Sequence, residues 1–175
     1  MEIPMESGTM QGMASGELIE KAILEAAGKP SDEITAEDLG ELQELHLSDI
    51  EITDLSPLAD LKGLRVLHLS NKQITDLAPL ADLTALKKLY LGFNHITDLS
   101  PLERLTDLRE LSLWNNQITD LQPLAELAQL DRLNLRENLV TDLWPLCDLK
   151  TLTRLELPCN YVSDLMPLEK LTSLE

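Results

Sequence analysis

The sequence predicts an α/β repeat solenoid, a stack of similar coils whose short strands form one parallel sheet. Three observations support this fold class. The chain repeats with a period of 22 residues, it is rich in leucine, and only 3% of its 175 residues are aromatic. Self-similarity at a fixed period indicates a repeat architecture, in which no unit buries its apolar side chains alone and neighbouring units share one aliphatic core.

Six full units of 22 residues run from Leu42 to Ser173, and each follows the pattern L-x-x-L-x-L-x-x-N-x-I-x-D-L-x-P-L-x-x-L-x-x. The third unit, LKKLYLGFNHITDLSPLERLTD, shows the pattern in full. The segment L-x-x-L-x-L ends in the alternation of a half-buried strand. Leu89 and Leu91 should therefore point into the core, and Lys88, Tyr90 and Gly92 should point away from it.

The second half of each unit is predicted to turn and to form a short helical turn. Asn at the ninth position can bond to backbone groups that no strand partner satisfies. Asp at the thirteenth position can cap a helical turn that begins near Pro. The six aspartates could instead share calcium ions, but capping explains why every unit has one. Ile50 and Lys72 replace Asn in the first two units, so we expect their turns to be less regular, with Asp49 and Asn71 as imperfect substitutes.

Residues 16–41 are predicted to form a helical cap on the first coil. Apolar residues recur there at helical spacing: Leu18, Ile19, Ala22, Ile23 and Ala26. Gly28 and Pro30 should end this helix, and Thr35 followed by Asp38 resembles the capping box of a second short helix.

The two ends of the chain differ from the repeats. Residues 1–15 are polar, rich in methionine and without periodicity, which predicts a disordered tail. Residues 174–175 begin a seventh unit, and the last coil has no matching cap. An uncapped coil exposes leucines and a strand edge, so we expect a monomer or weak self-association through this end.

Composition limits the classes of partner. Asp and Glu number 31 against 14 Lys and Arg, a net charge of −17. This acidity argues against binding nucleic acid or an anionic membrane, and is compatible with a basic protein partner or with simple solubility. No long segment lacks charges and no signal peptide begins the chain. We therefore expect a cytoplasmic protein as given, or a surface or secreted one if the sequence is a fragment.

Few residues suggest chemistry. His46 and His68 hold the same outward position in adjacent units, with Glu44 nearby, so they should lie side by side and could ligate a metal. Two ligands without an evident third favour ordinary exposed histidines, and we predict no metal and no cofactor. Cys159 has no histidine nearby in the repeat register, and the register separates it from Cys147, so neither a nucleophile nor a disulfide is expected. Equal unit lengths build no lid or cleft, and we predict no enzymatic activity.

The phrase ITDLSPL, at Ile52–Leu58 and again at Ile96–Leu102, resembles the bacterial internalin-like class of leucine-rich repeats. The similarity covers residues 42–173. It implies a right-handed, curved solenoid with parallel strands on the concave face, 3₁₀ turns on the convex face and an N-terminal helical cap. It also implies that the concave face recognises a protein.

We therefore predict a protein-interaction module. The alternative is a recognition domain from a larger effector, signalling or surface protein whose activity lies elsewhere. Aromatic and arginine side chains dominate binding hot spots, and Tyr90 and Trp114 should lie close together on the predicted face. Acidic and basic residues nearly balance on the strands, so an acidic or mixed-charge protein surface would suit this face. The predicted partner-binding residues are His68, Lys88, Tyr90, Phe93, Glu110, Trp114, Arg132, Arg136 and Arg154.

Overall fold

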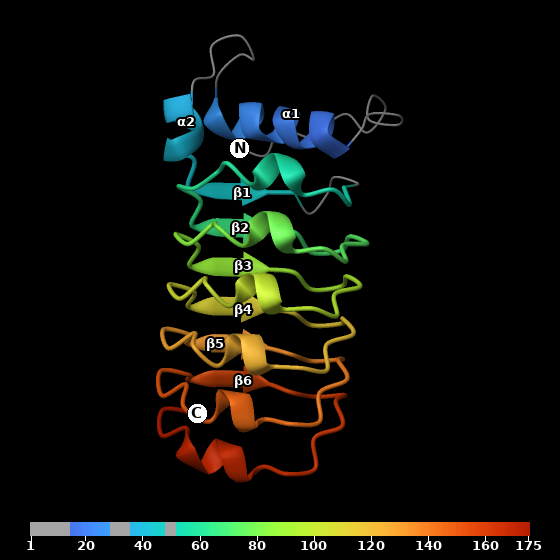
Figure 1. Cartoon of the computed structure of the whole chain (residues 1–175), viewed down its shortest axis with the longest axis vertical. Coiled ribbons are helices and arrows are strands. Elements are labelled where there is room, and N and C mark those ends of the chain that lie inside the picture. Colours follow the sequence, from blue (N-terminus) through green and yellow to red (C-terminus); the bar gives the residue numbers. More distant parts are fainter. Residues whose placement is uncertain (1–14, 29–35, 48–51) are drawn as a thin grey trace.

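The computed structural model describes residues 15–28, 36–47 and 52–175, and these residues form a stack of coils with helices at one end (Figure 1). Six three-residue strands pair in chain order into one parallel sheet. They are β1 (Glu44–His46), β2 (Val66–His68), β3 (Lys88–Tyr90), β4 (Glu110–Ser112), β5 (Arg132–Asn134) and β6 (Arg154–Glu156). The predicted α/β leucine-rich-repeat solenoid is confirmed.

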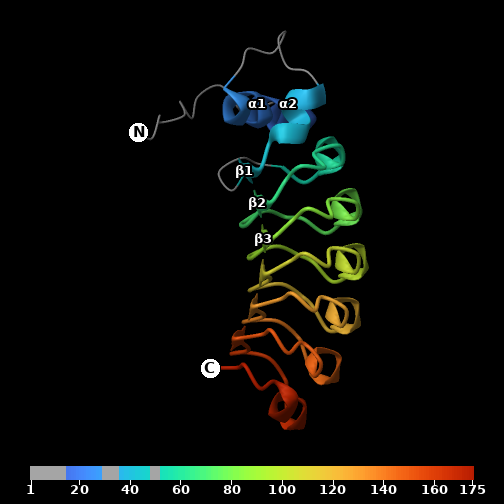
Figure 2. The same ribbon diagram turned by 90° about the vertical axis from the view of Figure 1, so that its left-hand side faces the viewer.

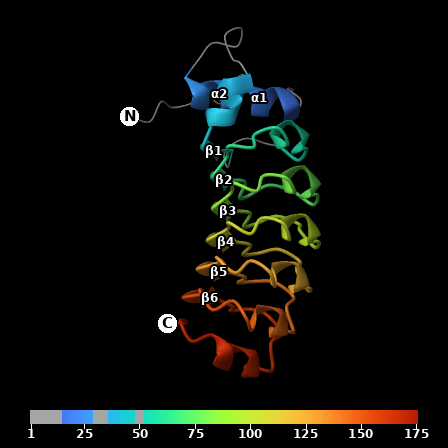
Figure 3. The same cartoon turned by 60° about the vertical axis from the view of Figure 1, so that its left-hand side comes forward.

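The stack is curved, with the sheet on its inner side. Figures 2 and 3 show the strands lining the concave side and the 3₁₀ turns on the convex side. The turns are η1 (Ser56–Leu58), η2 (Ala78–Leu80), η3 (Ser100–Leu102), η4 (Gln122–Leu124), η5 (Trp144–Leu146) and η6 (Met166–Lys170).

Leucines of successive coils form one continuous core. In the strands, each central leucine pairs in register with the equivalent leucine of the next coil, as Leu89 does with Leu111. Leu45, Leu47 and Leu111 are at most 1% exposed. The core therefore runs the length of the stack, and each coil contributes one layer.

The recurrent aspartate caps the 3₁₀ turn, as predicted. Asp98 Oδ1 accepts hydrogen bonds from the backbone N–H of Ser100 (2.8 Å) and from its hydroxyl (2.6 Å). These bonds hold the pKa of Asp98 below its usual value. Leu99 lies between Asp98 and Ser100 and precedes η3, whose second residue is Pro101. The equivalent backbone bond is made by Asp54, Asp76, Asp120, Asp142 and Asp164.

From the third coil onward, the recurrent asparagine ties each coil to the preceding one. Asn94 is 3% exposed, and its side-chain amide donates to the carbonyl oxygens of Leu91 and Leu69, both at 2.9 Å. Its Oδ1 accepts from the backbone N–H of Ile74 at 3.1 Å. Asn116, Asn138 and Asn160 repeat this pattern in the following coils.

The second coil is more regular than expected. Asn71 has φ 62°, close to the left-handed values of its equivalents Phe93 (59°) and Glu137 (56°). Asparagine adopts this conformation more readily than most residues, so the backbone turn survives although Lys72 brings no side-chain amide. The corresponding segment of the first coil, with Asp49 and Ile50, lies outside the described residues.

The N-terminal end is covered by two helices. α1 (Ser15–Ala27) packs against β1 and η1, and α2 (Ala36–Glu41) packs against α1. α1 buries Leu18, Ile19, Ala22 and Ile23, whereas Ala26 is exposed. Gly28 follows the helix with φ 67°, and its N–H bonds to the carbonyl of Leu24, a left-handed helix end. Residues 1–14, Pro30 and Thr35 lie outside the described residues.

The last coil presents its inward side chains to solvent. Leu155 and Leu157 are only partly buried, and Leu165 is 58% exposed although its equivalents, such as Leu99, are buried. Apolar groups that other coils bury between two neighbours thus have a neighbour on one side only. Leucines at the same repeat position should therefore contribute less to stability in the last coil than in the middle of the stack.

We predict that Leu111→Ala lowers the free energy of unfolding by about 2–5 kcal/mol, through lost burial and the cavity left behind. Leu155→Ala, the same change at the same repeat position in the last coil, should cost visibly less because Leu155 is already partly exposed. Denaturant melts of both variants measure the difference. Equal losses would contradict an end that is less tightly packed than the middle.

A second prediction concerns Gly63, the last residue of the first unit. A Cβ there would lie 1.8 Å from the carbonyl oxygen of Gly40 in α2, so Gly63→Ala should displace the cap and cost at least about 1 kcal/mol of stability, as strained substitutions do. Asp107→Ala, at the same position in the third unit, is the control and should be close to neutral. A melting temperature unchanged by Gly63→Ala would show that α2 does not seat on this residue.

Candidate partner-binding face

The outward side chains of the six strands form rows across the concave face. Residues at the same repeat position are in register from strand to strand, at a strand spacing of about 4.8 Å. Each row therefore places similar positions of neighbouring coils within contact distance. Two rows, one aromatic and one charged, account for most of the predicted site.

The first row is a ring stack made by His46, His68 and Tyr90. The ring centroids of His46 and His68 lie 4.0 Å apart at an interplanar angle of 14°, and those of His68 and Tyr90 lie 4.3 Å apart at 19°. Burial, together with a hydrogen bond to Glu110, raises the pKa of Tyr90 to about 12. Tyr90 thus stays a neutral hydrogen-bond donor at physiological pH.

The second row is an ion-pair row. The Lys88 ammonium and the Arg132 guanidinium each lie 3.8 Å from the same Glu110 carboxylate oxygen. Exposed pairs of this kind contribute little stability, but they set the charge pattern of the face. The predicted cations here are paired with carboxylates, and the row ends in two neighbouring cations, Arg132 and Arg154.

A hollow of ≈ 210 Å³ lies where the two rows meet. Its polar lining includes Tyr90, Glu110, Arg132 and Arg154, four of the predicted residues.

Three polar residues that line this hollow were not among those predicted: Ser112, Asn134 and Glu156. Glu156 accepts from Arg154 (2.7 Å) and from the Asn134 amide (3.0 Å). All three unpredicted residues occupy the fifth position of the repeat, as Tyr90 does, and this shared position could have indicated that they lie in the same row. The indication was weak because small polar residues do not mark a site by themselves.

The Trp114 indole packs beside Phe93 and over Gly92, and its expected proximity to Tyr90 stays a prediction. Its ring is 5.6 Å from that of Phe93, and it covers Gly92, where a Cβ would lie 1.9 Å from the indole nitrogen. Gly92 is therefore buried rather than facing solvent. Among the described residues, no ring contact joins Trp114 to Tyr90. In the sheet register Tyr90 pairs with Ser112, and Trp114 follows Ser112 by two residues.

Arg136 shares the repeat position of Trp114 in the next coil and lies at the same rim. Its Nε donates to Glu137 at 3.0 Å, and Glu137 also accepts from Asn115 at 2.8 Å. A second, larger hollow of ≈ 630 Å³ borders this rim on the loop side, where it is lined by Phe93 and Asn115 among others. Phe93 and Trp114, with Arg136, thus form a rim patch beside the ion-pair row.

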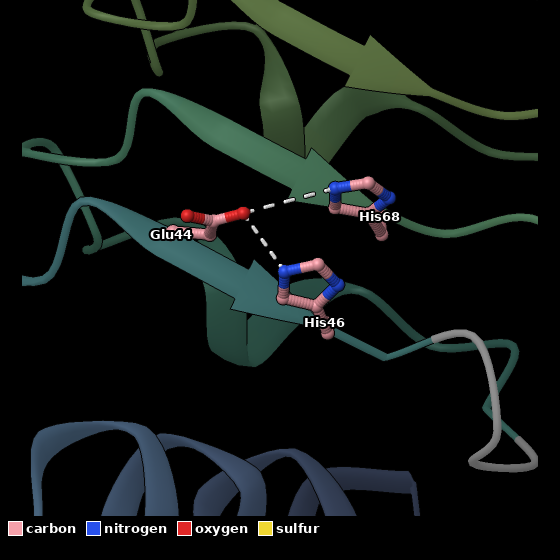
Figure 4. Close-up of side chains that lie close together, drawn as sticks. All are labelled: Glu44, His46 and His68. Atoms are coloured by element: carbon pink, nitrogen blue, oxygen red, sulfur yellow. Dashed lines mark hydrogen bonds and ion pairs between the residues drawn. The ribbon is translucent and has the colours of Figure 1, made fainter. Parts of the chain in front are cut away.

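One cluster of metal-binding side-chain types occurs in the described ranges: Glu44, His46 and His68. Glu44 Oε1 is 2.8 Å from His46 Nε2 and 4.0 Å from His68 Nε2 (Figure 4). Sequence reasoning named all three residues but counted only two ligands. Elsewhere, Cys147 and Cys159 are free thiols.

Comparisons with known proteins agree with this architecture. The family model described as Leucine Rich repeats (2 copies) matches residues 41–83, 84–126 and 106–151. An internalin of Listeria monocytogenes is 32% identical with a TM-score of 0.85, over 95% of this chain and 52% of its own. Internalin C2 of the same organism is 33% identical, with a TM-score of 0.69 and 90% of each chain covered.

A leucine-rich-repeat protein of Leptospira interrogans is also similar, with 33% identity and a TM-score of 0.71 over 79% of this chain and 37% of its own. The chain thus spans about half the length of the first internalin, 52%. No curated protein matches the sequence. In the described part of the chain, no helix has the length and apolar character needed to cross a membrane.

The ring stack generates a prediction about pH. Burial lowers the pKa of His68 from its ordinary 6.5, as does the charge of His46 and, more weakly, of Lys88, whereas Glu44 and Glu110 act in the opposite direction. Below about pH 6.5 the unfolded chain therefore takes up a proton more readily than the folded chain. Stability should fall as the pH decreases through this region.

Denaturant melts between about pH 7.5 and 5.5, with NMR titration of the imidazoles, measure this effect. His68→Gln should remove part of the pH dependence, and His95→Gln, a change of an exposed histidine outside the stack, is the matched control. A titration midpoint for His68 at or above the ordinary histidine value would contradict the stacked, partly buried arrangement.

Proposed function

This chain belongs to the leucine-rich-repeat family and its repeats are internalin-like, and from that premise we propose that it binds another protein through its concave face. Proteins with these repeats generally mediate protein–protein interaction, and internalin-like folds are typically non-enzymatic binding modules. The proposal goes further in assigning the surface and the residues.

The main support for the proposal is that aromatic and arginine side chains lie close together on one sheet. Tyr90, Arg132 and Arg154 surround the hollow of ≈ 210 Å³, and the rim patch adds Trp114. Tyrosine, tryptophan and arginine are enriched at binding hot spots. Because strands position the backbone beneath these groups, little backbone entropy is lost when a partner docks.

The charge pattern supports a partner of mixed or acidic surface. Glu110 lies between Lys88 and Arg132, so a partner with alternating charges can replace these contacts one for one. The net charge of −17 repels acidic proteins at long range, and local complementarity must overcome this repulsion. The concave face should therefore select a partner by the shape of its surface as well as by its charge.

A second candidate is that the chain is the recognition part of a larger protein. Its support is the comparison of lengths, because the chain covers 52% of the Listeria internalin and 37% of the Leptospira protein. In that case any further activity would lie outside these repeats. The length of the native open reading frame distinguishes the two candidates.

We also propose that the chain associates weakly with itself through its last coil. Tyr161, Leu165 and Met166 of the last coil are 58–68% exposed, and apolar patches of this kind favour association. Sedimentation of the chain with and without an added polar capping repeat tests the idea. A dimer that survives the capping repeat would place the contact elsewhere.

Replacing one tryptophan on each side of the molecule tests whether the concave face binds the partner. Proteins captured from lysate on the immobilised chain are identified and their affinities measured, and Trp114→Ala should weaken a true partner by about 2 kcal/mol or more. Trp144→Ala is the matched control, because Trp144 is exposed on the convex turn η5.

Arg132→Ala combined with Trp114→Ala should weaken binding further. Circular dichroism and melting curves establish that the variants fold. Binding that is lost with Trp144→Ala, and kept when Trp114 and Arg132 are both replaced, would move the recognition surface to the convex side.

A further inference from the structure

Three metal-ligating side chains converge on one point of the concave face, next to the cap. Glu44 and His46 point the same way from β1 because they are two residues apart, and His68 is the cross-strand partner of His46. Figure 4 shows the Nε2 edges of both rings turned toward the Glu44 carboxylate. All three ligand atoms lie within 4.8 Å of one another.

We propose that Glu44, His46 and His68 bind one divalent transition-metal ion of the zinc class. Two imidazoles and one carboxylate, with a further position left to solvent, form a donor set that suits Zn²⁺. Hard cations such as Ca²⁺ and Mg²⁺ prefer oxygen ligands, so the two nitrogens select against them. The three side chains offer this donor set whether or not a partner binds the concave face, although the site lies on the same face and shares His68 with the predicted partner-binding residues.

The geometry requires only small movements. In a tetrahedral zinc site the donor atoms lie about 3.3 Å apart, and the two distances from Glu44 Oε1 to the imidazole nitrogens are 2.8 and 4.0 Å. Two nearly parallel rings direct their lone pairs side by side, so one ring must tilt for both nitrogens to reach one ion. The His46 side chain is 62% exposed and is free to do so.

The less mobile ligand is His68. Its side chain is 27% exposed, and its ring is held between those of His46 and Tyr90. When the ion binds, the exposed His46 imidazole and the exposed Glu44 carboxylate therefore move toward His68, which is already positioned. The remaining coordination position faces solvent, because Glu44 is 56% exposed. An external donor can occupy it.

The test is titration of the full chain, free of any affinity tag, with Zn²⁺ by calorimetry in a non-chelating buffer. We expect one ion per chain, and perturbation of the imidazole NMR signals of His46 and His68 but not of His95. His46→Asn and His68→Asn should each weaken binding at least tenfold, and Glu44→Gln severalfold.

Two matched controls separate this site from scattered weak ones. His95→Asn removes an exposed histidine outside the cluster, and Cys159→Ser removes an exposed thiol; neither should change the affinity. Melting curves show whether each variant remains folded. No saturable binding at micromolar Zn²⁺, or binding that survives replacement of both His46 and His68, would overturn the proposal.

Discussion

Every coil of this protein buries its leucines against the coils beside it, and the rest of the structure depends on that constraint. A single 22-residue unit has no second layer of its own, so stability comes from the interfaces between units. The asparagine amides keep these interfaces in register. Asn116, for example, bonds to carbonyls of its own coil and of the preceding one, and satisfies polar groups that would otherwise be costly to bury.

The same constraint produces the functional surface. Because the leucines align from coil to coil, the outward residues align as well, and identical positions become rows. Rings placed at the fifth position stack, and charges placed at the third position pair. The concave face is therefore not a pocket formed by a special loop. Its chemistry is set by which side chain each repeat carries at a few unconstrained positions, while the core stays the same.

The candidate site could be predicted in part. Tyr90, Glu110, Arg132 and Arg154 do surround one hollow, and the repeat register was sufficient to place them there. The expected proximity of Tyr90 and Trp114 stays a prediction, whereas the packing of the indole on Gly92 and beside Phe93 was not predicted. In a single sequence, Gly92 at an outward position does not show whether it faces solvent or lies beneath a neighbouring side chain. Only the structure shows that the Trp114 indole covers it.

By itself, the sequence determined the fold class, the repeat boundaries and the identity of the core, because a periodic pattern of leucines has one way to be buried. It also determined the capping role of the aspartates, which is a local interaction between residues two apart. The repeat register also predicted that His46 and His68 lie side by side, as their stacked rings do, but only the tertiary structure decided the other contacts between side chains of different coils. The orientation of Glu44 toward both histidines, the sharing of Glu110 by two cations and the covering of Gly63 by α2 depend on rotamers and on the approach of separate segments. Such contacts are set by the packing of side chains between coils, which periodicity does not encode.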